Sequence, residues 1–380
     1  MMFNQEQFHA IVSGRRGDAR AGVARSLLGA ASLGYRVGVC IRNGLYDRYL
    51  LRSHRANAIV VSVGNLTTGG TGKTPLVVWL CRLLRGRQIR CAILTRGYKM
   101  RQGELSDEPA LLSSLCPGTA VVVNADRVAG AAEAIRQFEG ASPSNRGQDA
   151  RDTQGRDALA TGVLVMDDGF QHRRLARDLD IVAIDATRPF GYGRLLPAGL
   201  LREPVAGLRR AHAAVLTRCD QVSPEVLERI EEEIRRVNPD LVLARSIHVP
   251  VGVKTRDGAE IGLDRLGGQR LFAFCGIGNP PSFLHTVERL GGVLAGSRTY
   301  DDHYRYAAGD LDEIRQEATA REASLILTTQ KDWTKISRLA GSQDHPPVAY
   351  LAVELQIIAG VQALTALIDR VLGSTMPTAG

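Results

Sequence analysis

The chain has 380 residues, of which 44% are hydrophobic and 23% are charged, a composition that excludes wholesale disorder and predicts one large or two ordinary α/β domains. Its formal net charge of +8 favours an anionic partner: a nucleotide, a nucleic acid or an anionic membrane surface. The six cysteines include no CxxC pair, and no run of about 18 apolar residues occurs, so neither a disulfide framework nor a membrane-spanning helix is expected.

Residues 1–55 form a basic N-terminal segment. Between Arg15 and Arg55 there are nine arginines, but the only acidic residues are Asp18 and Asp47. Apolar side chains recur among them at roughly helical spacing, at Leu27, Leu28, Ala31, Leu33, Val37, Ile41 and Leu45. The pattern fits a basic amphipathic helix on anionic lipid. It also fits a helix packed on the core with a solvated arginine face, which is favoured by the helix-weakening glycines Gly29, Gly34, Gly38 and Gly44.

The first predicted strand, 59–63, is followed by a glycine-rich segment and a helical pattern over 73–84. This is the context of a phosphate-binding P-loop, because backbone N–H groups and the helix dipole both favour phosphate there. The predicted nucleotide cradle is Thr67, Thr68, Gly69, Gly70, Thr71, Gly72, Lys73 and Thr74. Lys73 is expected to reach the β- and γ-phosphates and Thr74 to ligate Mg²⁺. Thr67 stands where the strict GxxxxGK[ST] pattern needs glycine.

Two aspartates, Asp167 and Asp168, follow the apolar run 163–166. A carboxylate at the end of a buried strand is the usual way in which a P-loop enzyme holds Mg²⁺. The sequence does not decide which of the two would be the direct ligand, and one of them could instead cap a helix.

Further short apolar runs predict strands at 91–95, 120–123, 163–166, 181–184, 213–217, 241–244, 271–274, 325–328 and 349–353. Alternating with helical patterns, they indicate an α/β fold with a P-loop-type parallel sheet flanked by helices. We expect a kinase domain over 56–217, with a flexible polar insertion at about 140–162. A smaller α/β domain would follow over 218–372, its C-terminal helix able to pack back, before a tail at 373–380.

The motifs occur in a fixed order: VSVGNLTTGGTGKTPLVVWL, RGY, SDEP, DDGFQHRRLARDLDIVAID, GRLLPAGLLREP, FCGIGNPPSF, DDH and TQKD. Together, from about residue 33 to 333, they resemble the tetraacyldisaccharide 4′-kinase family of the lipid A pathway. In that family the first P-loop glycine is also replaced, so Thr67 is expected.

The resemblance implies phosphorylation by ATP and Mg²⁺ of the 4′-hydroxyl of a tetraacylated disaccharide 1-phosphate, which gives the lipid IVA precursor of lipopolysaccharide. It also implies a peripheral enzyme on the cytoplasmic face of the inner membrane. With a lipid substrate, membrane contact becomes the favoured interpretation of residues 1–55. No obligate protein partner is expected.

The resemblance assigns roles to individual residues. Asp107 matches the catalytic aspartate and His303 its histidine partner, with Lys73 and Arg202 also catalytic. Thr74, Asp167, Asp168 and Glu203 match metal-site positions, and Tyr98, Glu108 and Arg127 match substrate-binding positions. A sugar hydroxyl is a poor acid, so Asp107 would accept its proton while His303 orients Asp107. Without the resemblance, Asp107 is interpreted as a loop N-cap and His303 as a surface histidine.

Two departures from the family pattern stand out. Leu200 replaces a usual proline, and Gln330 replaces a common glutamate, which leaves the roles of Lys331 and Asp332 open.

The sequence leaves two alternatives open. A different P-loop kinase or a GTPase acting on a soluble substrate is one, because residues 217–220 (TRCD) distantly resemble a guanine-recognition NKxD, although the lysine is missing. A nucleic-acid-binding protein is the other, but only 5% of residues are aromatic and no RNA-binding motif with interleaved aromatics occurs. No nucleic-acid partner is therefore expected.

Overall fold

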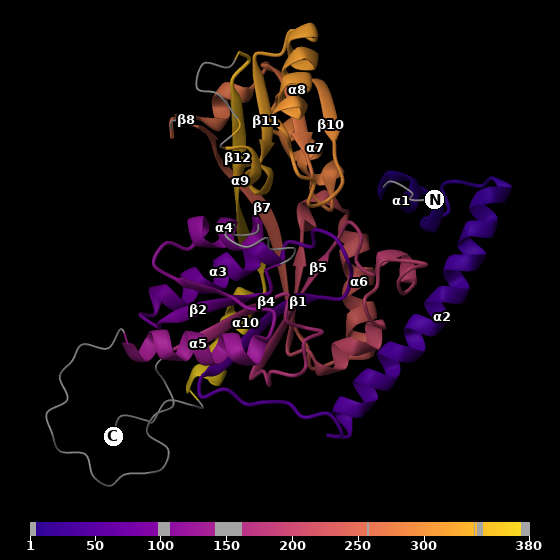
Figure 1. Cartoon of the computed structure of the whole chain (residues 1–380), viewed down its shortest axis with the longest axis vertical. Coiled ribbons are helices and arrows are strands. Elements are labelled where there is room, and N and C mark those ends of the chain that lie inside the picture. Colours follow the sequence, from indigo (N-terminus) through magenta and orange to yellow (C-terminus); the bar gives the residue numbers. More distant parts are fainter. Residues whose placement is uncertain are drawn as a thin grey trace, which may run out of the picture.

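The computed structural model describes residues 5–97, 107–140, 162–256, 258–337, 339 and 345–373. These residues form one twelve-stranded sheet that runs through two lobes (Figure 1). The strand order is β10-β9-β11-β12-β7-β6-β5-β1-β4-β2-β3, with β8 pairing with β7 off this path. Every pairing is parallel except those of β7 with β8 and with β12. The predicted α/β class with a mainly parallel sheet is confirmed.

The first lobe is built from the short apolar runs predicted as strands: β1 (Ile59–Asn65), β2 (Cys91–Thr95), β3 (Ala120–Val123), β4 (Val163–Asp167), β5 (Leu179–Asp185) and β6 (Ala213–Thr217). Parallel strands need crossovers, which helices provide on both faces of the sheet. These are α3 (Lys73–Gly86), α4 (Asp107–Leu115), α5 (Arg127–Gly140) and α6 (Pro224–Val237). Alternate residues of β1 pack on opposite faces, since Val61 joins the core around Leu76 and Val60 the core around Phe138.

Strand β1 lies between β4 and β5. In the parallel register Val63 is opposite Asp167, so β1 and β4 end side by side. This strand order brings the loop after β1 next to the acidic pair after β4, at the carboxyl edge where open α/β sheets bind ligands.

Two long strands, β7 (Val242–Thr255) and β12 (Val348–Ala359), link the lobes. β7 starts parallel to β6 and then pairs antiparallel with β12, from Ala349 opposite Thr255 to Ala359 opposite Arg245. The predicted runs, 241–244 and 349–353, were too short. Polar residues and Pro250 interrupt the apolar pattern of β7, because much of this ribbon is only half-buried.

The second lobe contains β8 (Glu260–Ile261), β9 (Arg270–Cys275), β10 (Val293–Thr299) and β11 (Leu325–Thr329). Its helices are α7 (Pro280–Arg289), α8 (Ala308–Ala320) and α9 (Gln330–Ile336). Strands β8 and β10 were not predicted, because β8 has two residues and β10 is mostly half-exposed and lacks a continuous apolar run. Short 3₁₀ turns complete the chain at η1 (Gly191–Gly193), η2 (Val205–Arg210), η3 (Cys219–Gln221) and η4 (Leu263–Leu266).

The C-terminal helix α10 (Val361–Gly373) packs on the first lobe, where Leu364, Ile368 and Leu372 join the core of α3. Helix α6, which follows the boundary expected near residue 217, also packs there through Leu227 and Ile230. The proposed division of the chain stays a prediction. Residues 141–161 of the expected insertion and 374–380 of the tail lie outside the described residues.

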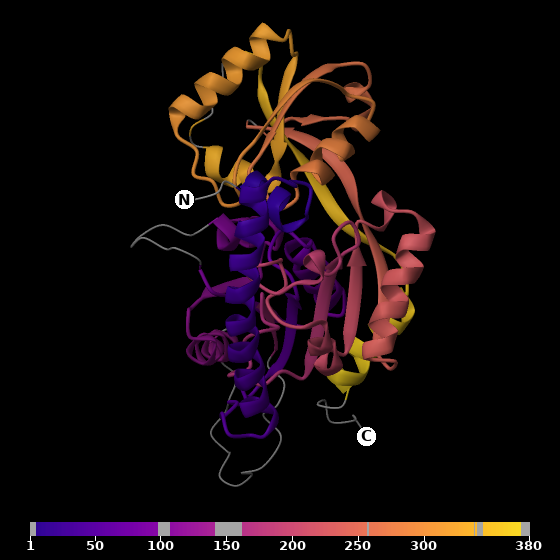
Figure 2. The same cartoon turned by 90° about the vertical axis from the view of Figure 1, so that its right-hand side faces the viewer.

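The N-terminal segment forms helix α1 (Gln5–Val12) and helix α2 (Ala19–Asp47). Helix α2 continues through its glycines for 29 residues, although each glycine costs about 1 kcal/mol relative to alanine. It runs along the outside of the first lobe (Figure 2). No helix in the described part of the chain combines the length and the apolar character needed to cross a bilayer.

Candidate active site

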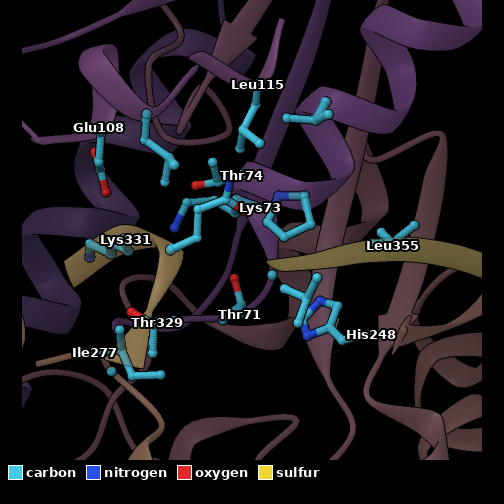
Figure 3. A pocket seen from close by; sticks show the side chains of 18 of the residues that line it. Thr71, Lys73, Thr74, Glu108, Leu115, His248, Ile277, Thr329, Lys331 and Leu355 are labelled. Atoms are coloured by element: carbon cyan, nitrogen blue, oxygen red, sulfur yellow. The ribbon is translucent and has the colours of Figure 1, made fainter. Parts of the chain in front are cut away.

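A cavity of about 1200 Å³ lies between the lobes. We call its first-lobe side the P-loop wall, formed by residues 68–75, Asp167, Asp168 and Arg202. The opposite wall, from the second lobe, is formed by Gly278, Asn279, Asp302, His303 and Lys331. Figure 3 shows Lys73 and Thr74 beside Glu108 and Lys331 in this space.

The P-loop is held in place by side chains at strand ends. Asn65 donates from Nδ2 to Thr71 Oγ1 at 3.0 Å, and Thr217 donates from Oγ1 to the Thr71 carbonyl at 2.9 Å. Gly72 has a φ of +83°, a conformation that side chains disfavour, and caps the start of α3. The loop's backbone is therefore fixed before any ligand binds, as an anion cradle requires.

Thr67, at the position of the missing glycine, does not line the cavity. It is buried and forms a β-bridge with Leu201. Residues 68–74 of the predicted cradle do line the cavity. The threonine side chain is accommodated because it faces the protein, whereas a loop that wrapped phosphate at this point would need glycine.

Asp167, at the end of β4, is buried, and its Oδ1 has no hydrogen-bond partner among the described residues. Burial, followed by the charges of Glu108 and Asp168, raises its pKa to about 7. Such an isolated buried oxygen is costly unless a ligand contacts it.

Asp168 differs sharply from its neighbour. It has a φ of +53°, and both its oxygens accept from Arg202 Nη1 at 2.8 Å, with Lys73 Nζ at 3.4 Å. Burial opposes ionisation of Asp168, but Lys73 and Arg202 outweigh it and hold its pKa below the usual range. A left-handed non-glycine residue is strained, and such strain concentrates at functional sites.

These oxygens fit Mg²⁺. Asp167, Asp168 and the Thr74 hydroxyl are hard oxygen donors on one wall of the cavity. Across the described ranges, no group of three or more His, Cys, Asp or Glu could hold a metal ion.

Arg127 lines the cavity, whereas Glu203 lies behind it. Arg127 is buried and donates to the carbonyls of Asn124 at 3.0 Å and Asp167 at 3.1 Å, so it braces the end of β4. Glu203 is fully buried, accepts from Arg210 at 2.6 Å and Gln171 at 2.7 Å, and does not line the cavity. Its expected role as a metal ligand stays a prediction that no contact in the described residues supports.

On the opposite wall, His303 has a φ of +64°. Its Nε2 lies 3.9 Å from Glu108 Oε1 and 3.8 Å from Asp302 Oδ2. Asp302 Oδ1 pairs with Lys331 Nζ at 2.9 Å. Burial raises the pKa of Asp302, but Lys331 and His303 outweigh it, so the net shift is downward.

Two predicted residues cannot be placed in this geometry. Tyr98 lies outside the described residues, and Asp107 is described only as the first residue of α4. The neighbouring Glu108 faces His303, so the start of α4 lies at the junction of the two walls. The pairing of Asp107 with His303 stays a prediction.

Comparison with known proteins assigns the family. A family model described as tetraacyldisaccharide-1-P 4′-kinase matches residues 24–373. The chain belongs to this family. It is therefore a phosphotransferase. The tetraacyldisaccharide 4′-kinase of Anaeromyxobacter dehalogenans (strain 2CP-C) is 36% identical, over 91% of this chain and 92% of its own length. That of Syntrophus aciditrophicus (strain SB) is 38% identical, over 87% and 89% respectively.

A solved structure agrees with this assignment. LpxK from Aquifex aeolicus, crystallised in complex with ATP, aligns with a TM-score of 0.64 and 30% identity, covering 92% of this chain and 99% of that chain. The predicted P-loop fold is thereby confirmed for this member of the kinase family.

Asn279 and Gly278 of this kinase were not among the predicted site residues. Asn279 donates from Nδ2 to Asp185 Oδ2 and to Thr187 Oγ1, both at 3.0 Å, and so joins the lobes. A Cβ on Gly278 would collide with the backbone of Gly69 and Gly70. The quoted motif FCGIGNPPSF contained this signal, but only the lobe arrangement shows what the glycine and asparagine contact.

Proposed function

We propose that the chain transfers the γ-phosphoryl group of ATP to the 4′-hydroxyl of a tetraacyldisaccharide 1-phosphate, giving the 1,4′-bisphosphate precursor of lipid A. The supporting observation is a single cavity that joins a P-loop and an acidic pair to a histidine on the facing lobe. Family membership supplies the substrate class, and the ATP bound by the Aquifex relative supplies the donor.

On the P-loop wall, Lys73 and Arg202 converge on Asp168. With nucleotide bound, we expect Lys73 to turn to the β- and γ-phosphates, while Arg202 stabilises the charge that develops on the transferred group. Thr74 and the acidic pair would hold Mg²⁺, which would neutralise part of the phosphate charge.

At the start of α4, where the two walls meet, Asp107 accepts the proton of the attacking hydroxyl. His303 lies 3.9 Å from Glu108, the residue that follows Asp107 in α4, which supports a role for His303 in orienting Asp107. Lys331, next to Asp302, keeps a cation beside these carboxylates. Burial disfavours the positive charge of Lys331, but the negative charges of Asp302 and Glu108 outweigh burial and raise the pKa of Lys331.

The GTPase alternative is not favoured. In the TRCD segment, Arg218 pairs with Asp185 at 2.5 Å, and Asp220 pairs with Arg289 of the second lobe. The aspartate that would read guanine is thus engaged by an arginine of the second lobe.

An anionic membrane surface is the partner that we propose for α2, on the cytoplasmic face of the inner membrane. Its exposed apolar side chains are Val23, Leu27, Leu33, Val37 and Ile41, between 57% and 68% exposed. With 3.6 residues per turn they form one stripe. Arginines flank the stripe, as charge attraction to anionic lipid requires.

The test of the reaction is transfer of labelled γ-phosphate from ATP to the purified disaccharide 1-phosphate in detergent. Wild type should phosphorylate it, and Asp107→Ala should turn over about 10²-fold more slowly or worse, because the base is lost. Hydrolysis that prefers GTP and ignores the lipid would reject the proposal. A change in KM alone would reassign Asp107 to binding.

The test of the membrane surface is co-sedimentation with anionic vesicles at low salt. Leu27→Glu with Ile41→Glu should release the protein from vesicles while nucleotide binding is unchanged, since the stripe residues are exposed and do not line the cavity. Unchanged partitioning would make α2 a purely structural helix.

A further inference from the structure

Helix α2 attaches to the first lobe through the face opposite its exposed apolar stripe. Ser32 donates from Oγ to the Leu195 carbonyl at 3.0 Å, and Tyr35 donates from its hydroxyl to the Arg202 carbonyl at 2.8 Å. Asn43 donates from Nδ2 to Glu203 Oε2 at 3.3 Å. Tyr35, Val39 and Asn43 are four residues apart, and Val39 is buried between the other two. One helix thus presents an apolar face outward and a polar contact face inward.

The segment that α2 contacts is bound on its other side to the P-loop. The Thr68 N–H donates to the Leu200 carbonyl at 2.8 Å, and the Arg202 N–H donates to the Leu66 carbonyl at 2.7 Å. The peptide groups of Arg202 are therefore held from two directions, by the root of the P-loop and by the Tyr35 hydroxyl.

The side chains of Arg202 and Glu203 extend these backbone contacts towards the P-loop and Asp168. Arg202 reaches Asp168 at 2.8 Å, beside Lys73. Glu203 accepts from Gln171 Nε2 at 2.7 Å, and that amide also donates to the Asn65 carbonyl at 2.8 Å. Glu203 is fully buried, so its carboxylate depends on its donors, which are Arg210, Gln171 and Asn43.

We propose that Tyr35 and Asn43 are positioning residues for phosphoryl transfer, through which α2 holds Arg202 and the P-loop in register when its apolar stripe is seated in the bilayer. The inference rests on the proposed function. A bilayer that fixes the outer face of α2 favours the conformation in which the inner face is docked, because the two faces belong to one rigid helix. Membrane contact is then part of the active site's geometry as well as an anchor.

The test compares Tyr35→Phe with the matched substitution Tyr46→Phe on the same helix. Tyr46 makes its contact through its ring, which lies 5.2 Å from the Arg173 guanidinium and is retained in phenylalanine. Losing the single Tyr35 hydrogen bond should lower kcat on vesicle-presented disaccharide by about 3- to 10-fold. KM for ATP, vesicle partitioning and Tm should not change, and Tyr46→Phe should match wild type. Asn43→Leu, which keeps side-chain size, should act in the same direction.

Two outcomes would overturn the proposal. Either Tyr35→Phe behaves like Tyr46→Phe, or its kcat falls only in step with vesicle partitioning, which would make Tyr35 an anchor residue.

A second readout needs no lipid substrate. Amide hydrogen exchange over residues 66–72 and 195–203 should be faster in Tyr35→Phe than in Tyr46→Phe, and slower in wild type with anionic vesicles than without. If wild type transfers no phosphate but its amide exchange still changes with vesicles and with Tyr35→Phe, the proposed function fails while the coupling of α2 to the P-loop stands. If transfer is normal and exchange is the same in all three proteins, the coupling fails.

Discussion

The two walls of the cavity are assembled in different ways. On the P-loop wall, Lys73 and Thr74 begin the helix that comes after β1 and the P-loop, and Asp167 ends the neighbouring strand. On the opposite wall, Asp302 and Lys331 are 29 residues apart in the chain and meet through an ion pair. The first wall follows from local sequence and strand order, whereas the second exists only because the second lobe folds as a unit and β7 and β12 carry it to the first.

The difference also appears in the electrostatics. On the P-loop wall two cations surround Asp168, while Oδ1 of Asp167 has no hydrogen-bond partner among the described residues and the pKa of Asp167 is raised. On the opposite wall, Lys331 pairs with Asp302 and faces Glu108 from the other lobe. We therefore expect substitutions on the P-loop wall to abolish phosphoryl transfer. Substitutions on the opposite wall should only slow it, by disturbing the alignment of the acceptor hydroxyl with the phosphates.

The largest expected effect is on the P-loop wall. Lys73→Ala should lower phosphate transfer by about 10²- to 10³-fold, because the lysine acts on charge that develops on the phosphoryl group. Labelled-phosphate transfer measures it, with Tm as a check of folding. Activity above about a tenth of wild type would show that the P-loop wall does not carry the chemistry.

On the opposite wall, Lys331→Met should lower kcat by about 10- to 100-fold with little change in KM for ATP. Methionine keeps the length of the side chain but removes the cation that Asp302 and Glu108 share. Steady-state kinetics separate the two parameters, and Lys331→Arg should recover part of the loss. A rise in the ATP KM alone would place Lys331 with nucleotide binding and remove the distinction between the walls.

The smallest expected effect is on stability, and it concerns the β7–β12 strand pair between the walls. There His248 of β7 packs against the P-loop. A Cβ on Gly72 would lie 3.1 Å from His248 Nε2, a buried atom without a described partner. Burial, followed by the charge of Arg218, lowers the pKa of His248 to about 3. In the unfolded chain His248 takes up a proton near pH 6.5, whereas in the folded chain it does so only near pH 3. The free energy of unfolding therefore falls as the pH drops from about 6.5 towards 3.

At pH 5 this lost stability amounts to about 1–2 kcal/mol in the free energy of unfolding. His248→Asn should abolish that part of the pH dependence, as measured by urea unfolding at pH 8 and pH 5. The same substitution at the exposed His285 is the control. Equal pH dependence in both variants would show that His248 is not held neutral against the P-loop.

By itself the sequence determined the P-loop, the acidic pair at the end of β4 and the α/β class. These depend on contiguous residues and on apolar runs, whose physics is local. It also supplied the motifs that place the chain in its kinase family. The sequence showed that Thr67 replaces the first P-loop glycine. It did not show that Thr67 forms a β-bridge with Leu201, which explains why a threonine fits there.

Tertiary structure alone decided the rest. It showed that Glu203 is buried away from the cavity, how long β7 and β12 are, and that Asn279 contacts Asp185. Each of these features depends on residues from distant parts of the chain. The same holds for α2, where a helical pattern showed an apolar stripe but could not show that Tyr35 and Asn43 reach Arg202 and Glu203. Such contacts are set by how whole lobes and helices pack, and no local pattern in the chain encodes which side chains then meet.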